Sequence, residues 1–424
     1  MREIKRDAYL QKLIAKKENG LIKVITGIRR SGKSYLLFNL YRDYLRSVGV
    51  AEENIITIAL DDEANAEYRN AKALSEYVRS RVSDKSQEFY VFIDEIQYAI
   101  KKEELKSGEP LPLYGVLNGF LHLGNVDVYV TGSNSKLLSK DVLTEFRGRG
   151  DEVRVYPLTF KEYYDYVGGD KDDAFEEFMT YGGLPYVLSL NDVKDKIKYL
   201  TDLFKEVYFK DITERYDIGL PGVMQLITDD LCSSIGSLVN STKIANTLTT
   251  VKKTKVDAET ISKYLEFLEE SFLFSQVKRY DVKGKKYFSY PSKYYCADTG
   301  LRNARINFRQ DEETHAMENI IYNELIARGY NVDVGVVEVS EDGKRKRCEI
   351  DFVVNLGPER YYIQSAFNMS DENKEKTELR PLLATKDFFK KIIISKTHSK
   401  KRINEQGIIY IGLYNFLLDK DSLN

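Results

Sequence analysis

The chain has 424 residues, more than one hydrophobic core usually organises, so we expect roughly three or four domains. Lys and Arg (64) nearly balance Asp and Glu (66), which excludes a strongly basic or acidic protein, so any basic surface must be local. Three cysteines, Cys232, Cys296 and Cys348, are isolated in sequence, which argues against a zinc site or disulfide framework and favours a reducing cytoplasm. No apolar leader and no run of about eighteen apolar residues occurs, so we expect a cytoplasmic protein without a membrane partner.

The first functional signal follows an apolar, strand-like run over residues 21–26. Residues 27–34 read Gly-Ile-Arg-Arg-Ser-Gly-Lys-Ser, the G-x-x-x-x-G-K-S pattern of a phosphate-binding loop, and a helical pattern follows. Glycine tolerates the dihedral angles that turn backbone N–H groups toward an anion, and the helix dipole adds to the attraction. We expect Lys33 to reach the β- and γ-phosphates of ATP and Ser34 to contact Mg²⁺. The predicted nucleotide contacts are Gly27, Arg30, Ser31, Gly32, Lys33, Ser34 and Tyr35.

The second signal is a continuous apolar run that ends in two carboxylates. Residues 89–95 read Phe-Tyr-Val-Phe-Ile-Asp-Glu, which is typical of a buried parallel strand. Ligands bind at the carboxyl ends of strands in open α/β sheets, so Asp94 and Glu95 are expected to face the nucleotide. We expect Asp94 to hold Mg²⁺ and Glu95 to be the base that polarises the attacking water. Another strand is predicted over residues 55–60 and a polar helix over residues 70–83.

A further strand over residues 126–130 runs into the polar segment Thr-Gly-Ser-Asn-Ser. A polar side chain at the tip of this strand is suited to lie between the γ-phosphate and the water, and we choose Asn134, with Ser133 second. The alternative is a Gly-Ser turn that only caps the next helix. Downstream, Arg149 and Arg147 are candidates for an arginine that neutralises transition-state charge, from the same chain or a neighbouring subunit. The predicted catalytic set is Lys33, Glu95, Asn134 and Arg149.

These motifs together resemble the prokaryotic AAA-type ATPases that join an ATPase module to a C-terminal domain of restriction-endonuclease-like fold. The segments that carry the resemblance are residues 27–34, 92–97, 131–135, 148–149, 157–163, 181–185 and 210–212. The resemblance covers nearly the whole chain. It implies a parallel-sheet ATPase core over residues 1–158, with Lys33 and Ser34 at the phosphates and metal, Asp94 and Glu95 at the metal and water, and Arg149 as the arginine. It does not imply a substrate.

Residues 159–232 read as helical and are predicted to form a small lid domain over the nucleotide. Residues 233–304 have a different pattern: a helix, a polar turn, a second helix over 257–268, then strand-like runs over 273–277 and 286–290 that we predict to pair as a hairpin. This is the order of elements in a winged helix.

The predicted winged helix is locally basic. Its lysines and arginine are Lys252, Lys253, Lys255, Lys278, Arg279, Lys283, Lys285 and Lys286. We expect DNA contact through the second helix and the wing, since phosphate contacts need such cations. The alternative is an interdomain module whose lysines face water. Three acids count against a basic reading helix: Glu266, Glu269 and Glu270.

Residues 305–424 are predicted to form the restriction-endonuclease-like domain. A helix over roughly 312–328 carries Glu318, and a later strand carries Asp351, which match the first two acids of such a site. Where the fold requires acid-x-Lys, this chain has Gln364, Ser365 and Ala366. Because that acid and lysine are both missing, we expect an inactive scaffold or a protein-binding surface. Glu349, as a partial compensation, keeps cleavage as an alternative.

The sequence therefore predicts an α/β protein in which an ATPase drives a C-terminal module that recognises DNA or a partner protein. The first alternative is a slow switch in which ATP only gates that binding. The second alternative is a Mg²⁺-dependent nuclease. An arginine acting between subunits requires a homo-oligomer, which the sequence leaves open.

Overall fold

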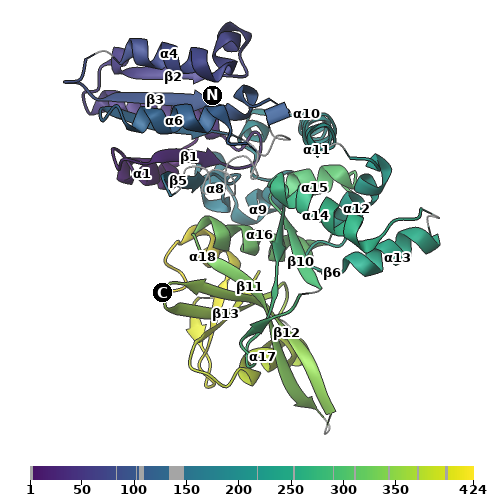
Figure 1. Cartoon of the computed structure of the whole chain (residues 1–424). Helices are drawn as coiled ribbons and strands as arrows, with labels where there is room; N and C mark the ends of the chain where they lie inside the picture. The colour runs from purple at the N-terminus through teal and green to yellow at the C-terminus, as the bar shows by residue number, and fades with distance from the viewer. Residues whose placement is uncertain are drawn as a thin grey trace. The chain divides into compact units, whose positions relative to one another are not determined.

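The computed structural model describes residues 3–82, 84–101, 103–104, 109–132, 148–216, 218–251, 254–289, 291–309, 312–341, 344–369, 372–396 and 400–424. The chain divides into two compact units (Figure 1). The N-terminal unit comprises Glu3–Pro157 with Glu270–Phe272, and the C-terminal unit comprises Leu158–Glu269 with Leu273–Asn424. Within the described ranges, none of the helices has the length and apolar character needed to cross a membrane.

The N-terminal unit is built on a parallel five-stranded sheet. Its strands are β1 (Ile22–Thr26), β2 (Ile55–Ala59), β3 (Phe89–Asp94), β4 (Val126–Thr131) and β5 (Gly150–Arg154), in the order β2-β3-β4-β1-β5. The strands predicted over residues 55–60, 89–95 and 126–130 are confirmed, each within a residue of its expected end. All six residues of β3 are buried, as the continuous apolar run predicts for a parallel strand.

Helices cover both faces of this sheet. They are α1 (Asp7–Ala15), the continuous helix formed by α2 (Lys33–Tyr35), η1 (Leu36–Tyr41) and α3 (Arg42–Ser47), and on the other face α4 (Ala71–Arg81) and α6 (Pro112–Leu121). Strand alternation divides the core. In β3, Val91 and Ile93 pack with Leu117 of α6, while Tyr90 and Phe92 pack on the opposite face.

The C-terminal unit combines a helical part with two sheets. Its helices are α8 (Phe160–Val167), α9 (Lys171–Tyr181), α10 (Val193–Asp202), η7 (Leu203–Phe209), α11 (Lys210–Tyr216), α12 (Pro221–Ser233), α13 (Ser241–Val251), α14 (Ala258–Glu270), α15 (Thr299–Arg305), α16 (Glu313–Ala327), α17 (Glu372–Ala384) and α18 (Leu413–Leu418). The expected helical character of residues 160–232 is thus confirmed.

One sheet of the C-terminal unit is small and antiparallel. It contains β6 (Leu238–Val239), β10 (Ser292–Cys296) and β7 (Phe274–Val277), in that order. The other sheet is mixed and has the order β15-β16-β14-β13-β12-β11-β8-β9. Its strands are β8 (Arg279–Asp281), β9 (Lys286–Tyr287), β11 (Asn331–Glu341), β12 (Lys344–Leu356), β13 (Glu359–Ala366), β14 (Lys390–Ser395), β15 (Arg402–Ile403) and β16 (Ile408–Gly412).

The predicted hairpin between residues 273–277 and 286–290 is wrong in its pairing. Strand β7 pairs with β10, while β9 pairs with β8 and extends the mixed sheet. Burial explains the choice: all five residues of β10 are buried, whereas both residues of β9 are exposed. A strand buried on both faces suits the centre of a sheet, and an exposed Lys-Tyr pair suits an edge.

The predicted lid and the predicted last domain share one hydrophobic core. Phe160 of α8 and Phe175 of α9 belong to the same buried cluster as Met317 of α16 and Phe416 of α18. The rings of Phe160 and Tyr414 lie 6.1 Å apart between centroids. The division of the chain into four domains stays a prediction, and α8 and α9 are part of the described core of the C-terminal unit.

Candidate nucleotide-binding site

The phosphate-binding loop joins the carboxyl end of β1 to the start of α2. Gly27 and Gly32 have φ angles of 137° and 94°, which favour glycine. A Cβ at Gly27 would also lie 2.1 Å from the Val155 carbonyl oxygen, so no larger residue fits beside β5 there. The predicted strand, loop and helix are therefore all present, and both glycines have a backbone reason to be glycine.

Lys33 is buried inside this loop. Its Nζ donates to the carbonyl oxygens of Gly27 and Ile28 at 3.0 and 2.9 Å. Burial lowers the pKa of Lys33, and the carboxylates of Glu95 and Asp94 oppose that effect. The lysine predicted for the phosphates and the two predicted acids are thus close enough to interact.

A polar group in the loop also lacks a partner. The Ser31 hydroxyl oxygen is buried, and no hydrogen bond to it exists among the described residues. A buried hydroxyl without a partner costs about 1–3 kcal/mol, which a phosphate oxygen bound in the loop would offset. Together with the space kept by Gly27, this orphaned hydroxyl fits an anionic ligand such as a triphosphate.

Asp94 ends β3 and is connected to the helix that follows the loop. Burial raises its pKa, while hydrogen bonds with Thr131 and Ser34 lower it. Thr131 Oγ1 donates to Asp94 Oδ1, and Thr131 Oγ1 also accepts from the Glu95 backbone N–H at 3.1 Å. Ser34, Asp94 and their interactions fit a Mg²⁺ site, because hydroxyl and carboxylate oxygens are the ligands this ion prefers.

Glu95 lies directly after β3 in a left-handed backbone conformation, with a φ of 54°. Non-glycine residues rarely adopt this conformation, and they concentrate at functional sites. Its side chain is partly exposed and accepts a hydrogen bond from the Gln97 side chain. An accessible carboxylate beside Lys33 is suited to polarise a water molecule.

Thr131 is the residue at this site that sequence reasoning missed. The prediction favoured Asn134 and Ser133, just beyond the strand, and both lie outside the described residues, as does Arg147. Thr131 is the last residue of β4, which lies between β1 and β3 in the sheet. Its position as the polar last residue of a buried central strand is the signal that identifies it.

Arg149 does not join this group within its own chain. Its carbonyl oxygen accepts from the Ile22 N–H at 2.8 Å, at the start of β1, and β5 begins one residue later. The phosphate-binding loop follows Thr26, at the opposite end of the same strand. Parallel strands share their direction, so Arg149 lies at the amino edge of the sheet and the loop at the carboxyl edge. Of the two alternatives left open by the sequence, the geometry therefore does not favour action in the same chain, and the role of Arg149 toward a neighbouring subunit stays a prediction.

The two other predicted contacts of the loop region are accessible. Arg30 is exposed, with a φ of 64°, and Tyr35 is 45% exposed. Neither side chain is needed for the core, so both are available to a ligand.

The loop is also held from outside by Arg6, a residue that sequence reasoning did not single out. Arg6 is buried, and its guanidinium donates to the carbonyl oxygens of Ser31 at 3.1 Å and Tyr156 at 2.8 Å. It also stacks over the ring of Tyr9 at 4.5 Å, and the Tyr9 hydroxyl accepts from the Tyr156 N–H at 3.2 Å. The segment before α1 thus connects the phosphate-binding loop to the residues that follow β5.

A second polar cluster lies in the C-terminal unit, where the sequence predicted a degenerate nuclease site. Glu318 and Asp351 do come together, around Lys293 of β10. Lys293 Nζ lies 2.9 Å from Glu318, 2.7 Å from Glu349 and 4.0 Å from Asp351. Burial alone would lower the pKa of Lys293, but these three acids raise it above its ordinary value. Sequence reasoning missed Lys293 because it lies on a strand of the other sheet.

The residues at the acid-x-Lys position have structural contacts. Gln364 accepts from the Asp351 N–H at 2.7 Å and donates to Glu378 at 2.7 Å, and the Ser365 N–H donates to Asp351 at 2.8 Å. Burial, followed by the charge of Glu318, raises the pKa of Asp351 well above its usual range. No group of three or more His, Cys, Asp or Glu residues in the described ranges is arranged to hold a metal ion.

Comparison with known families agrees with the N-terminal geometry. Residues 19–164 match the family described as an AAA domain, and residues 172–312 match a domain of unknown function. The N-terminal unit is therefore an AAA-type P-loop ATPase domain, as its resemblance predicted. The restriction-endonuclease-like fold of residues 305–424 stays a prediction.

Relatives of the whole chain are known. An uncharacterized protein of Haemophilus influenzae is 35% identical over 415 residues, which cover 96% of this chain and 97% of the relative. An uncharacterized protein of Methanocaldococcus jannaschii is 28% identical over 389 residues, covering 88% and 79% of the two chains. Among solved structures, a Walker-type ATPase of Pyrococcus abyssi is 20% identical, with 72% of this chain and 96% of that chain covered and a TM-score of 0.49.

Proposed function

This chain belongs to the same family as the uncharacterized Haemophilus influenzae protein, and we propose that its AAA domain binds and hydrolyses ATP to control a C-terminal recognition module. The observation that carries the proposal is the convergence of Lys33, Ser34, Asp94 and Glu95 at the carboxyl edge of one parallel sheet. A loop that only turned the chain would not need a buried lysine beside two acids.

Each of these side chains has a defined part in the proposed reaction. Lys33 exchanges the carbonyl oxygens of its own loop for the β- and γ-phosphates, and the Ser31 hydroxyl gains a phosphate partner. Ser34 and Asp94 hold Mg²⁺, which when bound neutralises charge on the phosphates. Glu95 accepts a hydrogen bond from the attacking water and polarises it. Asn134 remains our candidate for the residue between that water and the γ-phosphate.

The test is a pair of variants of the full chain. Lys33→Ala is expected to abolish nucleotide binding, because the triphosphate loses its main counter-charge. Glu95→Gln is expected to bind ATP normally and to lower the hydrolysis rate by about 10²–10⁴-fold, the usual contribution of a general base. Nucleotide binding is measured by calorimetry and hydrolysis by phosphate release. Rapid turnover by Glu95→Gln would remove Glu95 from its role.

Arg149 is proposed only as a residue that acts toward a neighbouring subunit. This follows from its position at the amino edge of its own sheet, and it makes a homo-oligomer part of the proposal. Mixing Arg149→Ala with Glu95→Gln subunits tests it. If each subunit completes its neighbour's site, the mixture of the two inactive variants is expected to recover part of the ATP hydrolysis. A mixture that stays inactive would exclude that role.

The recognition module is proposed to include a winged helix. Its support is the chain order α12, β6, α13, α14, β7 and β10, with the three strands joined in one antiparallel sheet. DNA is the proposed ligand of this part, and a protein partner is the proposal for residues 305–424.

The alternative is a slow nucleotide-gated switch. The steady-state rate of ATP hydrolysis, with and without DNA, distinguishes it from an active remodeller. Stimulation by DNA favours an active remodeller, and a flat slow rate favours the switch.

The nuclease alternative has weaker support. Lys293 already neutralises Glu318 and Glu349, and Gln364 stands where a metal-binding acid is needed. Plasmid cleavage with Mg²⁺ or Mn²⁺ that is lost in Asp351→Ala would favour this alternative over an inactive scaffold.

A further inference from the structure

Helix α13 exposes a polar face without a single acidic residue. The exposed side chains of its described part are Thr242, Lys243, Asn246, Thr247, Thr249 and Thr250. Its buried side chains are Ser241, Ile244, Ala245 and Leu248. The helix is therefore amphipathic, and its outer face offers hydroxyl, amide and ammonium groups.

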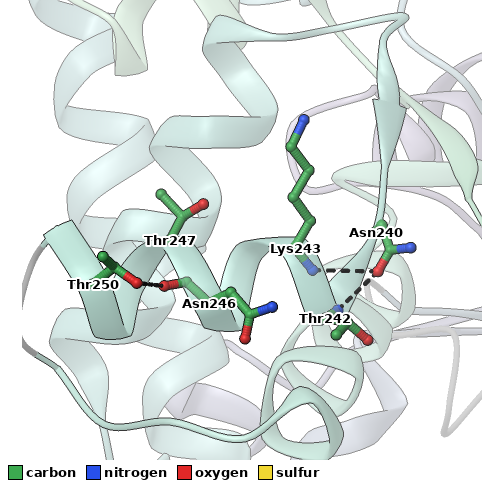
Figure 2. Close-up of a pocket in the computed structure, with 6 residues that line it drawn as sticks. All are labelled: Asn240, Thr242, Lys243, Asn246, Thr247 and Thr250. Carbon is green, nitrogen blue, oxygen red and sulfur yellow. Dashed lines mark hydrogen bonds between the residues drawn. The ribbon is translucent and has the colours of Figure 1, made fainter.

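A shallow hollow of about 520 Å³ lies along this face (Figure 2). Its lining consists of Asn240, Thr242, Lys243, Asn246, Thr247 and Thr250. Asn240 caps the helix, accepting from the Thr242 N–H at 2.9 Å and the Lys243 N–H at 3.3 Å. The Thr250 hydroxyl donates to the Asn246 backbone carbonyl oxygen at 2.7 Å, and the Asn246 side chain is exposed. The hollow is thus ordered by its own backbone and lined by polar side chains.

The charge of this segment is one-sided. Between Asn240 and Val256 the sequence contains Lys243, Lys252, Lys253 and Lys255 and no Asp or Glu. Lys252 and Lys253 lie outside the described residues, and Lys255 is exposed. Among the described residues, Asp230 of α12 is an acid that interacts with Lys243. The segment therefore complements a polyanion.

Helix α14, the second helix to which the sequence assigned DNA contact, has the opposite character. Its exposed acids are Glu259, Glu266 and Glu269, and its exposed lysine is Lys263. Phosphates would be repelled from this face. The structure thus moves the expected contact from α14 to α13, one helix earlier in the chain.

The chemistry of the face favours duplex DNA over a protein or an RNA duplex. Protein interfaces have an apolar, often aromatic centre, whereas the exposed residues 242–250 of α13 are Thr, Asn and Lys. Ser, Thr, Asn and Lys side chains are common phosphate contacts, and Asn pairs with adenine in the major groove. An α-helix fits the major groove of B-DNA, while the deep and narrow major groove of A-form RNA excludes it.

We propose that the exposed face of α13 is a contact surface for duplex DNA, with Lys243 on a phosphate and Asn246 facing the groove. This proposal rests on the proposed function in that it names the partner of the ATPase. It differs from the contact predicted from the sequence, because among the three successive helices α12, α13 and α14 the middle helix, not the last, carries the contact.

The experiment is fluorescence anisotropy of the full chain with a labelled duplex of about 20 base pairs, two turns of B-DNA, titrated over a range of salt concentrations without nucleotide. Lys243→Ala is expected to weaken binding and to reduce the slope of log K against log salt by about 1. The matched control is Lys263→Ala, the same truncation of an exposed lysine on α14. It is expected to leave the affinity for the duplex and the slope of log K against log salt unchanged. The double variant Asn246→Glu with Thr250→Glu is expected to weaken binding at least about tenfold, since it sets two carboxylates against phosphates.

The outcomes separate this proposal from the ATPase proposal. Equal effects of Lys243→Ala and Lys263→Ala, unchanged binding in the double variant, no binding to the duplex at low salt, or equal affinity for an RNA duplex would each overturn the α13 assignment. Circular dichroism verifies that the variants are folded, since all substituted side chains are exposed. Failure of ATP hydrolysis would overturn the ATPase proposal without changing these titrations, which contain no nucleotide.

Discussion

At the scale of single residues, the shape of the phosphate-binding loop depends on a side chain outside the loop. Arg6 is 5% exposed and bonds two carbonyl oxygens, one in the loop and one after β5. Lys33 satisfies two other loop carbonyls, at Gly27 and Ile28, and is expected to leave them when phosphates bind. Arg6 would then be the side chain that keeps the loop in place through the exchange.

Replacing Arg6 is therefore predicted to weaken nucleotide binding more than turnover. In Arg6→Ala the Ser31 carbonyl loses its donor, a loss of about 1–2 kcal/mol, so the dissociation constant for ADP should rise about tenfold. Arg6→Lys keeps one donor and should lie between wild type and alanine. Calorimetric titration with ADP and the KM and kcat for ATP are the measurements.

The control for Arg6 is an exposed arginine of the same unit. Arg46 of α3 is 58% exposed at its side chain and pairs with surface acids, so Arg46→Ala should leave nucleotide affinity unchanged. A fall in kcat with unchanged KM and unchanged ADP affinity in Arg6→Ala would contradict the positioning role.

The site residues that could be predicted from the sequence are those that lie in a recognisable local pattern. Lys33 and Asp94 lie in or at the end of recognisable runs, and parallel strands end at the same edge of a sheet, so their meeting was predictable. Arg6 and Lys293 were not, because each contacts partners far along the chain and no local pattern marks them. For Arg149 the sequence left open whether it acts in its own chain or toward a neighbour, because a motif indicates residue type but not the edge of the sheet at which the residue lies.

At the scale of elements, one buried carboxylate joins α9 to α15. Asp298 caps α15, accepting from the Leu301 N–H at 3.0 Å, and also accepts from the Gly183 N–H at 2.7 Å. A Cβ at Gly182 would lie 2.2 Å from the Asp298 Oδ1, so glycine at this position after α9 allows the acid to approach. Burial raises the pKa of Asp298, and the hydrogen bonds from these N–H groups lower it. Burial is the larger effect, and the pKa is raised to about 6.

This shift predicts a pH dependence of stability with a defined sign. A pKa raised on folding means that the folded state binds the proton more tightly, so the contribution is present below about pH 4 and is lost as pH rises to about 6. Its size is at most about 3 kcal/mol. Between pH 4 and 6 the unfolding free energy of the wild type should therefore fall relative to that of Asp298→Asn. Above pH 7 the difference between the two proteins should stay constant. Urea denaturation of both proteins measures this difference.

A second cap provides a control of opposite sign. Asp257 accepts from the Thr260 N–H at 2.7 Å at the start of α14 and is exposed, and this hydrogen bond lowers its pKa. Its contribution should be lost as pH falls through the folded-state pKa, so Asp257→Asn should converge with wild type in acid. A level difference for Asp298→Asn across pH 4–6 would contradict the assigned burial effect.

Elements were more predictable than their pairing. The run at residues 89–95 identifies a buried strand by composition alone, and it is one. The partner of β7 was not predictable, because residues 286–290 and 292–296 are both strand-like, and only burial in the assembled unit selects β10. The same limit applies to α8 and α9, whose aromatic faces indicate a core but not that α16 and α18 complete it.

At the scale of the whole molecule, the phosphate-binding loop lies in one unit and the acid-free exposed face of α13 lies in the other. A useful coupling between them requires only that ATP and ADP states differ in affinity for DNA. Thermodynamic linkage then demands that DNA change the affinity for nucleotide by the same factor. This reciprocity is a property of equilibrium binding and can be measured without knowing how the units move.

The last prediction uses Glu95→Gln, which is expected to hold ATP without turnover. Duplex affinity of this variant with ATP and with ADP should differ by about 5–150-fold, the usual range of coupling between sites, and DNA should shift the ATP-to-ADP affinity ratio by that same factor. Lys33→Ala should show one nucleotide-independent affinity. Equal duplex affinities in the two nucleotide states would mean that the ATPase does not control α13, even if each site binds its ligand. A coupling of this size with a hydrolysis rate that DNA leaves unchanged would identify the switch rather than the remodeller.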